Sequence, residues 1–377
     1  MPPRLDDDHH GDQGAGEPAA AMPLSPRQSR VVGALLGLHA GDALGATLEF
    51  ETHAAVAASH PRGLRDIVGG GPFRWPAGHA TDDTDMTRGV LLAYRDAAAA
   101  AAAAAGDADA DVDVARRAGD YFVRWLQGDW PGRVFGSRPV DIGAATIKGL
   151  LRYVDSQDPD RAGAGQGAAG NGSLMRCLPT GLFQTDPGRL VDESQRISRI
   201  THDDRRCTVA CAAYNTIVAE LVRGAPADDA VRAGEAVAAR LEGDHGDGNG
   251  DGDGDGDGDG GGPVLAALRL GRRLSVADMA DPRGGGPPPE MLPGRCGGYV
   301  LETLAVGVAA VLDTGRGLED VLVDVVRLGK DTDTNAAVAG GLLGARDGEE
   351  AVPRRWRDKL QFADEFRSIA LSLTAAP

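Results

Sequence analysis

The sequence predicts an all-α protein, and three observations support this fold class. Apolar residues recur at the spacing of a helix face through most of the 377-residue chain. Small residues dominate and aromatic residues make up only 4%, which suits closely packed helices better than an aromatic-rich β-sandwich. Almost no segment alternates apolar and polar residues as a half-buried strand does. With 42% apolar residues, the chain is long enough to bury a sizeable core.

The predicted helices follow one another along the chain. The first is expected over residues 27–49, where Val31 and Leu35 belong to an apolar repeat of helical spacing. The segment 53–80 contains three consecutive glycines followed by a proline and is expected to be a loop. A second helix opens near Thr81 and continues into a run of alanines, which favours helix. A loop is expected at 281–295, and further helices are expected at 113–127, 141–154, 173–183, 188–200, 204–223, 227–241, 263–271, 298–313, 317–328, 333–346 and 352–374.

The chain is expected to form one domain with two flexible segments. Residues 1–26 lack an apolar pattern and are predicted to be a disordered tail, so that the domain spans 27–377. Residues 243–262 are mostly a Gly-Asp repeat, typical of a flexible, solvated insertion. A calcium loop is disfavoured there because no glutamate occupies the twelfth position of any register. Helical patterns on both sides of the insertion look alike, so it does not mark a domain boundary.

Composition also limits the possible partners and compartment. A net charge of −17 disfavours binding to nucleic acid or to anionic membranes. No run of about 18 apolar residues indicates a membrane span, and the first residues lack the apolar core of a signal peptide. The four cysteines form no CxxC pair, which disfavours a zinc site and suits reduced thiols. A cytoplasmic location is therefore expected.

The first motif that carries chemistry is Thr81-Asp82-Asp83-Thr84, at the start of a predicted helix. Threonine and aspartate are favoured helix caps, so the motif has a purely structural interpretation. Capping needs only one side chain, however, and adjacent carboxylates repel one another unless a cation lies between them. By itself this motif does not decide between capping and metal binding.

A second motif, Asp331-Thr332-Asp333-Thr334, favours metal binding over helix capping. It also precedes a buried helix, and residues two apart on a helix point about 200° away from each other. The two aspartates therefore converge only if one of them lies in a non-helical cap. Carboxylate and hydroxyl oxygens from two such motifs are the ligands that Mg²⁺ or Mn²⁺ prefers, whereas zinc favours histidine and cysteine.

A third acidic element is the pair Asp42 and Glu49. The two residues are seven apart, about two helical turns, so they lie on one face if the first helix continues that far. They sit among apolar residues and glycines, which suits a buried face better than an exposed stripe. Buried carboxylates need a partner.

Six motifs in this order resemble the ADP-ribosylglycohydrolase family, of the dinitrogenase reductase-activating glycohydrolase type. The similarity extends from about residue 30 to the end of the chain. The motifs are the Gly-Asp-x-x-Gly-x-x-x-Glu segment 41–49, Thr81 to Thr84, Asn171 to Arg176, Thr201-His202, Gly298 to Leu304, and Asp331 to Thr334. The resemblance implies a compact multi-helix fold with a central metal cleft that binds two Mg²⁺ or Mn²⁺ ions.

The resemblance also assigns roles to individual residues. Glu49 matches a glutamate beside the metals that is implicated in catalysis, and we expect general acid or base chemistry from it or from one of the aspartates, Asp83 or Asp333. His202 and Asp141 match positions in the substrate cleft. Asn171, Gly172 and Ser173 match the loop that cradles the diphosphate and ribose. The metal ligands implied by motif position are Thr81, Asp82, Asp83, Asp331, Asp333 and Thr334.

The implied activity is metal-dependent hydrolysis of an ADP-ribose glycosidic bond in an ADP-ribosylated protein or small molecule. One departure from the family is Lys330, which stands where a small residue is usual and favours the alternative of an impaired ADP-ribose-binding protein. A metal-dependent hydrolase of another glycosidic or phosphate bond is a further alternative, as is a helical protein whose acidic motifs are only caps. The segment Gly165–Gly170 fits GxGxxG but follows a polar turn instead of a strand, so a dinucleotide fold is disfavoured.

Overall fold

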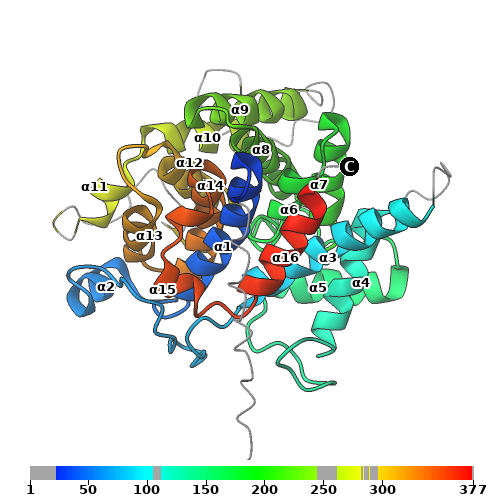
Figure 1. Cartoon of the computed structure of the whole chain (residues 1–377), viewed down its shortest axis with the longest axis horizontal. Helices are drawn as coiled ribbons and strands as arrows, with labels where there is room; N and C mark the ends of the chain where they lie inside the picture. Colours follow the sequence, from blue (N-terminus) through cyan, green and yellow to red (C-terminus); the bar gives the residue numbers. More distant parts are fainter. Residues whose placement is uncertain are drawn as a thin grey trace, which may run out of the picture.

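The computed structural model describes residues 23–104, 112–243, 261–281, 283, 288 and 296–375. Within these residues the regular secondary structure is helical (Figure 1), and the only β pairing is two isolated bridges, Gly70 with Trp75 and Gly170 with Tyr299. The prediction of an all-α fold is confirmed. The predicted tail lies outside the described residues except for its last few positions, as does nearly all of the Gly-Asp insertion.

The helices agree with the predicted order along most of the chain. They are α1 (Pro26–Gly45), α2 (His53–Ser59), α3 (Asp82–Ala103), α4 (Val114–Leu126), α5 (Ala144–Ser156), α6 (Leu178–Phe183), α7 (Pro187–Arg199), α8 (Arg205–Arg223), α9 (Ala227–Gly243), α10 (Pro263–Arg273), α11 (Val276–Ala280), α12 (Val300–Leu312), α13 (Leu318–Arg327), α14 (Thr332–Asp347), the 3-10 turn η2 (Glu349–Ala351), α15 (Arg354–Arg357) and α16 (Ala363–Thr374).

Three predicted boundaries are wrong, and α2 lies at the start of the segment 53–80 that was expected to be a loop. The first helix ends at Gly45, where the chain meets the start of α14, and residues 46–50 form a turn. The helix predicted from residue 173 begins only at Leu178, after a turn. The last predicted helix is broken between α15 and α16, because Gln361 leaves helical geometry and donates its backbone N–H to the Gly78 carbonyl. At Gly45 and at Gln361 a contact with a distant segment overrides local helix preference.

The helices α1 and α14 lie side by side through the middle of the molecule (Figure 1). Glycines at every fourth position of α1 face α14, and a side chain at Gly37 would collide with the backbone of Gly340. The same holds at Gly41 against Ala336, and at Gly45 against Thr332. Because no side chains separate the two backbones there, the start of α14 lies directly against the end of α1.

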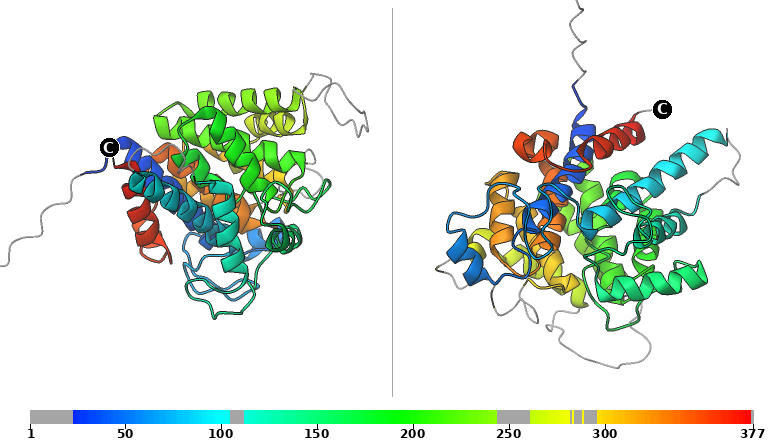
Figure 2. Two further views of the ribbon diagram at one scale, coloured as in Figure 1. Left: turned by 90° about the vertical axis from the view of Figure 1, so that its right-hand side faces the viewer. Right: turned by 90° about the horizontal axis from the view of Figure 1, so that it is seen from below.

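The remaining helices pack around this central pair. Helices α9 and α10 form an outer layer over α8 and α12, while α3, α4 and α5 lie on one flank (Figure 2). Helix α16 covers the open side of α1 and contacts α3. No helix in the described part of the chain combines the length and apolarity needed to span a bilayer.

Candidate active site

A cleft of about 700 Å³ opens where α3, α5 and α14 begin. One end of the cleft is acidic, and the other is lined by glycines, a threonine, an asparagine and a histidine. Because the N-terminal ends of several helices point toward it, their partial positive charge favours anionic groups in the cleft. The lining includes Glu49, Phe50, Phe73, Asp82, Val140, Asp141, Gly143, Thr146, Asn171, Gly172, His202, Lys330, Asp331, Asp333 and Thr334.

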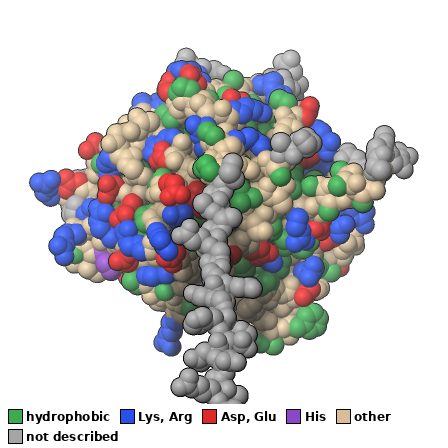
Figure 3. All heavy atoms as spheres, in the orientation of Figure 1, with side chains coloured by type: hydrophobic (Ala, Val, Ile, Leu, Met, Phe, Trp, Pro, Cys, Tyr) green, Lys and Arg blue, Asp and Glu red, His purple; other side chains and the backbone are tan. Residues whose placement is uncertain are grey.

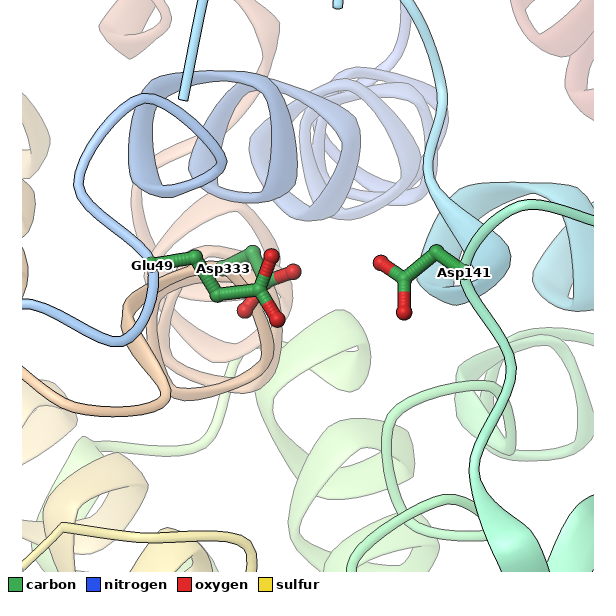
Figure 4. A group of neighbouring side chains, drawn as sticks. All are labelled: Glu49, Asp141 and Asp333. Carbon is green, nitrogen blue, oxygen red and sulfur yellow. The ribbon is translucent and has the colours of Figure 1, made fainter. Parts of the chain in front are cut away.

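Three carboxylates that are far apart in sequence meet at the acidic end (Figure 4). Glu49, Asp141 and Asp333 each offer one oxygen, and these oxygens lie within 4.8 Å of one another. Glu49 comes from the turn after α1, Asp141 from the loop before α5, and Asp333 from the first turn of α14. Such a group of desolvated oxygens matches what a divalent cation requires.

The two acidic motifs are in direct contact. Asp83 is buried, and its Oδ2 accepts a hydrogen bond from the Thr334 hydroxyl at 3.2 Å and from the Thr81 hydroxyl at 3.4 Å. Its other oxygen, Oδ1, is buried and has no partner among the described residues. Asp82, in the same turn of α3, lines the cleft. The start of α3 is thus joined to the start of α14.

Asp331 connects the acidic end to the opposite wall. It is the N-cap residue of α14, outside regular helical geometry, which allows it to converge with Asp333. Its Oδ2 accepts a hydrogen bond from the Asn171 side-chain amide at 2.7 Å, and the same amide donates to the Thr303 hydroxyl at 3.0 Å. The position of Asn171 is therefore fixed by Asp331 and Thr303.

Asp42 does not share a face of α1 with Glu49, so that expectation is wrong. The helix ends before Glu49, and Asp42 is fully buried behind α3, where its Oδ2 accepts hydrogen bonds from the Thr84 hydroxyl and the Thr81 and Thr84 amides. Asp42 caps α3 from a distance of about 40 positions in the sequence. The sequence indicated that Asp42 is buried and needs a partner, but only the structure shows that this partner is the start of α3.

Burial and mutual repulsion favour protonation of the acidic residues. Burial, followed by the charges of Asp141 and Asp331, raises the pKa of Glu49 to about 9. Burial also raises the pKa of Asp141 to about 7, and it raises the pKa values of Asp82, Asp83 and Asp333. Glu49 Oε2, like Asp83 Oδ1, is buried without a hydrogen-bond partner. Divalent cations would supply both the missing partner and the missing charge, so the residues present fit such ions.

The other end of the cleft presents hydrogen-bond donors. Helix α5 begins there, and its N-cap Gly143 provides no side chain to satisfy the first amides of the helix. Gly172 and Thr146 line the same region. Ser173 is different, because its buried hydroxyl accepts from Ser198 at 2.8 Å and the residue is not part of the cleft lining. Free amides at a helix N-terminus form an anion site.

His202 lies in this donor-rich wall with a defined orientation. Burial, together with the nearby Arg176 cation, lowers the pKa of His202 to about 3, so the ring is neutral at neutral pH. Its Nδ1 lies 2.7 Å from the Thr201 hydroxyl, which itself accepts from Arg176 Nη2 at 2.7 Å. With Nδ1 accepting from that hydroxyl, the ring proton is on Nε2.

Arg176 positions this wall of the cleft, and the sequence did not reveal that arrangement. It is fully buried, lies over the Phe122 ring at 4.6 Å, and donates to the Gly172 carbonyl at 2.9 Å. It therefore holds both the Gly172 turn and, through Thr201, the His202 ring. An arginine among buried apolar residues was the available signal, but its partners are backbone groups and a hydroxyl brought together by folding.

Lys330 lies at the edge of the cleft with its side chain exposed. Its backbone adopts a φ of 67°, in the left-handed region that favours glycine. Its N–H donates to the Glu51 carbonyl at 2.6 Å, and its carbonyl accepts from the Phe50 N–H at 2.7 Å. These two bonds fix the turn that carries Glu49 against the start of α14.

Comparison with known proteins identifies the family. The family model for ADP-ribosylglycohydrolases matches residues 23–377. The chain belongs to the ADP-ribosylglycohydrolase family. It is 30% identical to the ADP-ribosyl-[dinitrogen reductase] glycohydrolase of Rhodospirillum rubrum over 338 residues, covering 89% of this chain and 92% of the relative.

Two further comparisons agree with this family. The ADP-ribosylarginine hydrolase Tri1 of Pseudomonas putida (strain GB-1) is 29% identical over 372 residues, covering 94% of this chain and 80% of the relative. A solved structure of an ADP-ribosylglycohydrolase-related protein complex is 28% identical with a TM-score of 0.67, covering 93% of this chain and 98% of that one. The predictions of this family, of its all-α fold and of an enzyme are confirmed. The roles assigned to single residues stay predictions.

Proposed function

We propose that this ADP-ribosylglycohydrolase hydrolyses an ADP-ribose glycosidic bond in a reaction that depends on Mg²⁺ or Mn²⁺. The observation that carries the proposal is the two-ended cleft, which combines a buried carboxylate cluster with uncapped helix amides. ADP-ribose has matching parts, since its ribose hydroxyls suit a metal site and its diphosphate suits helix N-termini. The family membership and the relatives named above support the same activity.

Two metal ions would be held at the acidic end. The residues with suitable oxygens are Thr81, Asp82, Asp83, Asp331, Asp333 and Thr334, and Glu49 and Asp141 each place an oxygen within 4.8 Å of an Asp333 oxygen. Bound divalent cations polarise hydroxyl groups and lower the pKa of water, which is the chemistry they would supply here. The unpartnered oxygens of Asp83 and Glu49 support this assignment.

The chain's own residues orient the substrate. The first amides of α5 and the backbone around Gly172 would hold the diphosphate, and His202 Nε2–H would donate to an oxygen of the substrate in the cleft. Asn171 is held by Asp331 and Thr303, so it keeps the donor-rich wall at a fixed distance from the acidic end. Orientation of this kind lowers the entropic part of the barrier.

Bond cleavage would take place at the acidic end. The bond from ribose C1″ to the leaving nitrogen or oxygen breaks, water adds to C1″, and a proton passes to the leaving group. Glu49 is our candidate for moving that proton, because it lines the cleft and keeps one oxygen free of protein partners. Asp83 and Asp333 are the alternatives. The surrounding carboxylates stabilise positive charge that develops on the ribose.

The substrate would be an ADP-ribosylated protein or a small ADP-ribose conjugate, and we expect the enzyme to act in the cytoplasm. The four cysteines are all free and buried, which suits a reducing compartment. The net charge of −17 supports the expectation that neither nucleic acid nor a membrane is a partner.

The direct test is release of ADP-ribose. The protein is incubated with ADP-ribosylarginine or with an arginine-ADP-ribosylated protein, with Mg²⁺ or Mn²⁺ and in parallel with EDTA. We expect free ADP-ribose with the metal and none with EDTA. If calorimetry shows that both metal and ADP-ribose bind, and yet none of these substrates releases ADP-ribose, the proposed hydrolysis is wrong for this linkage.

A further inference from the structure

Two exposed apolar side chains stand at the mouth of the cleft, each beside a carboxylate of the cluster. Phe50 directly follows Glu49 and is 64% exposed, and Val140 directly precedes Asp141 and is 67% exposed. Both line the cleft. Exposing large apolar side chains to water is unfavourable, and such groups gathered at one place indicate an interaction site.

The apolar surface continues outward from Val140 along the same loop. Val134 and Phe135 are 77% and 78% exposed, so they are among the most exposed large apolar residues in the described chain. A depression of about 280 Å³ shares Asp82, Val140 and Asp141 with the cleft and reaches Val134. Hydrophobic side chains are visible at the lower right of the molecule in Figure 3, near the position of the loop before α5 in Figure 1.

This loop has a defined conformation despite its exposure. The Arg133 guanidinium donates to the Trp125 and Ser137 carbonyls, both at 2.6 Å, and so ties both ends of the turn together. Ser137 also donates its amide to the Val134 carbonyl at 2.9 Å. A surface that is ordered before a partner arrives loses less entropy on binding.

Three exposed cations are neighbours of residues that line the mouth. Arg74 directly follows Phe73 in the sequence, Lys330 lines the cleft beside Phe50, and Arg138 lines the neighbouring depression two residues before Val140. Within the described part of the chain none of the three forms an ion pair, although most of the protein's charge is acidic. Unpaired cations in this position complement acidic groups on a partner.

We propose that the lip formed by Phe50, Val134, Phe135, Arg138 and Val140 is the docking surface for a folded, ADP-ribosylated protein. On this partner protein, apolar and acidic side chains would flank the ADP-ribosylated residue, because they complement the apolar and cationic side chains of the lip. This inference rests on the proposed function, which places the glycosidic bond at the carboxylate cluster, one residue away from Phe50 and Val140. A protein attached through that bond would cover the lip, whereas a small conjugate would occupy the cleft, whose lining includes neither Val134 nor Phe135.

The test compares a protein substrate with a small one. The lip variant is Val134→Ser/Phe135→Ser, which leaves every residue of the cleft lining in place. Its matched control is Leu151→Ser/Val154→Ser, which alters two exposed apolar residues of α5 outside the cleft lining (54% and 39% exposed). Each is assayed with an arginine-ADP-ribosylated protein and with free ADP-ribosylarginine, and equal unfolding temperatures confirm that both variants are folded.

For the lip variant we expect kcat/KM on the modified protein to fall roughly tenfold, as at a moderate interface hot spot. The value for ADP-ribosylarginine should stay within about twofold of wild type, and the control should change neither. Arg138→Glu should lower kcat/KM for the modified protein only. Arg161→Glu, which alters an exposed arginine outside the cleft lining, should leave kcat/KM for both substrates unchanged.

Three results would overturn the docking surface: an equal loss on both substrates, an equal loss in the control variant, or a wild-type dimer that the lip variant converts to monomers. If wild type releases no ADP-ribose at all, the proposed function fails separately. The modified protein then stays intact, and the same variants are compared by its direct binding to a sensor surface, where unchanged affinity of the lip variant contradicts the inference.

Discussion

The two ends of the cleft differ in the charge they present to a ligand. The acidic end gathers carboxylates from the turn after α1, from α3, from the loop before α5 and from α14, and two of their buried oxygens, Glu49 Oε2 and Asp83 Oδ1, lack partners among the described residues. The other end presents uncapped amides of α5 and a neutral His202. One end therefore favours cations and the other favours anions.

The proposed ligand, ADP-ribose, has parts that match both ends, since its ribose hydroxyls suit a metal site and its diphosphate suits helix N-termini. The ends are connected through Asn171, whose amide donates to Asp331 while its own backbone N–H donates to the Gly298 carbonyl. A change at one end should therefore mainly affect metal binding and chemistry, and a change at the other should mainly affect ligand affinity. Separate measurements of the affinity for metal, of the affinity for ADP-ribose and of the turnover rate distinguish these effects.

The largest effect is expected at the acidic end. Asp331→Asn/Asp333→Asn removes two negative charges from the cluster, so we expect Mg²⁺ affinity to be lost and hydrolysis to fall roughly 10³-fold or more. Calorimetry and ADP-ribose release measure the two quantities. Asp364→Asn, at an exposed position of α16, is the matched control. Unchanged metal binding in the double variant would mean that the motif serves only as a helix cap.

A smaller effect is expected at the donor-rich end. A Cβ at Gly172 would lie 2.8 Å from His202 Cε1, so Gly172→Ala must displace the ring. We expect the Kd for ADP-ribose to rise about tenfold, equivalent to about 1.4 kcal/mol, with Mg²⁺ affinity preserved. Gly315→Ala, where a Cβ meets nothing within 4 Å, is the control. Equal loss of metal and ligand binding would show that the two ends do not act separately.

The acidic end also predicts a pH dependence of stability without metal. The folded state raises the pKa of Glu49 to about 9 and of Asp141 to about 7, above their ordinary values of 4.5 and 3.8. The folded protein therefore holds more protons than the unfolded chain, and its stability falls as pH rises from about 4 to about 9. Thermal unfolding in EDTA should show this decline, and added Mg²⁺ should reduce it. An unfolding temperature in EDTA that rises through this range would contradict the assignment.

The smallest effect is expected at the rim between the two ends. Lys330→Gly relieves a left-handed backbone at φ 67° but adds freedom to the unfolded chain, so the stability change should stay within about 1 kcal/mol. Because the side chain is exposed, we expect kcat/KM to change less than about threefold. A gain in Mg²⁺ affinity of about tenfold or more would instead favour the alternative of a site impaired by this lysine.

Much of the fold was predictable from local sequence, because an apolar repeat of helical spacing reflects one buried face. The buried apolar residues of α1, α8 and α14 show this directly. The two acidic motifs were equally visible, since aspartates at helix starts have a limited set of explanations. Their contact through Asp83 and Thr334 could be expected only on the assumption of a shared metal.

The structural features that could not be predicted from the sequence all depend on contacts between residues distant along the chain. The role of Asp42 follows from the end of α1 at Gly45, which the backbone of Thr332 sets. The burial of Ser173 away from the cleft follows from its hydrogen bond to Ser198. The loop that carries Phe135 has no periodic pattern, and its shape depends on Arg133 reaching the carbonyl of Trp125. No local propensity encodes these arrangements.

The glycine contact between α1 and α14 has a consequence for the order of events during synthesis. Helix α1 leaves the ribosome first, but its partner begins only at Thr332. At 5–20 residues per second, roughly 15 to 60 s separate the two. Throughout that interval Glu49 has no Asp333 beside it, and the surface of α1 that later contacts α14 is open to other chains. Because the proposed active site includes Asp333, we expect no hydrolysis before α14 is synthesised, and a chain truncated before α14 would leave that surface of α1 uncovered.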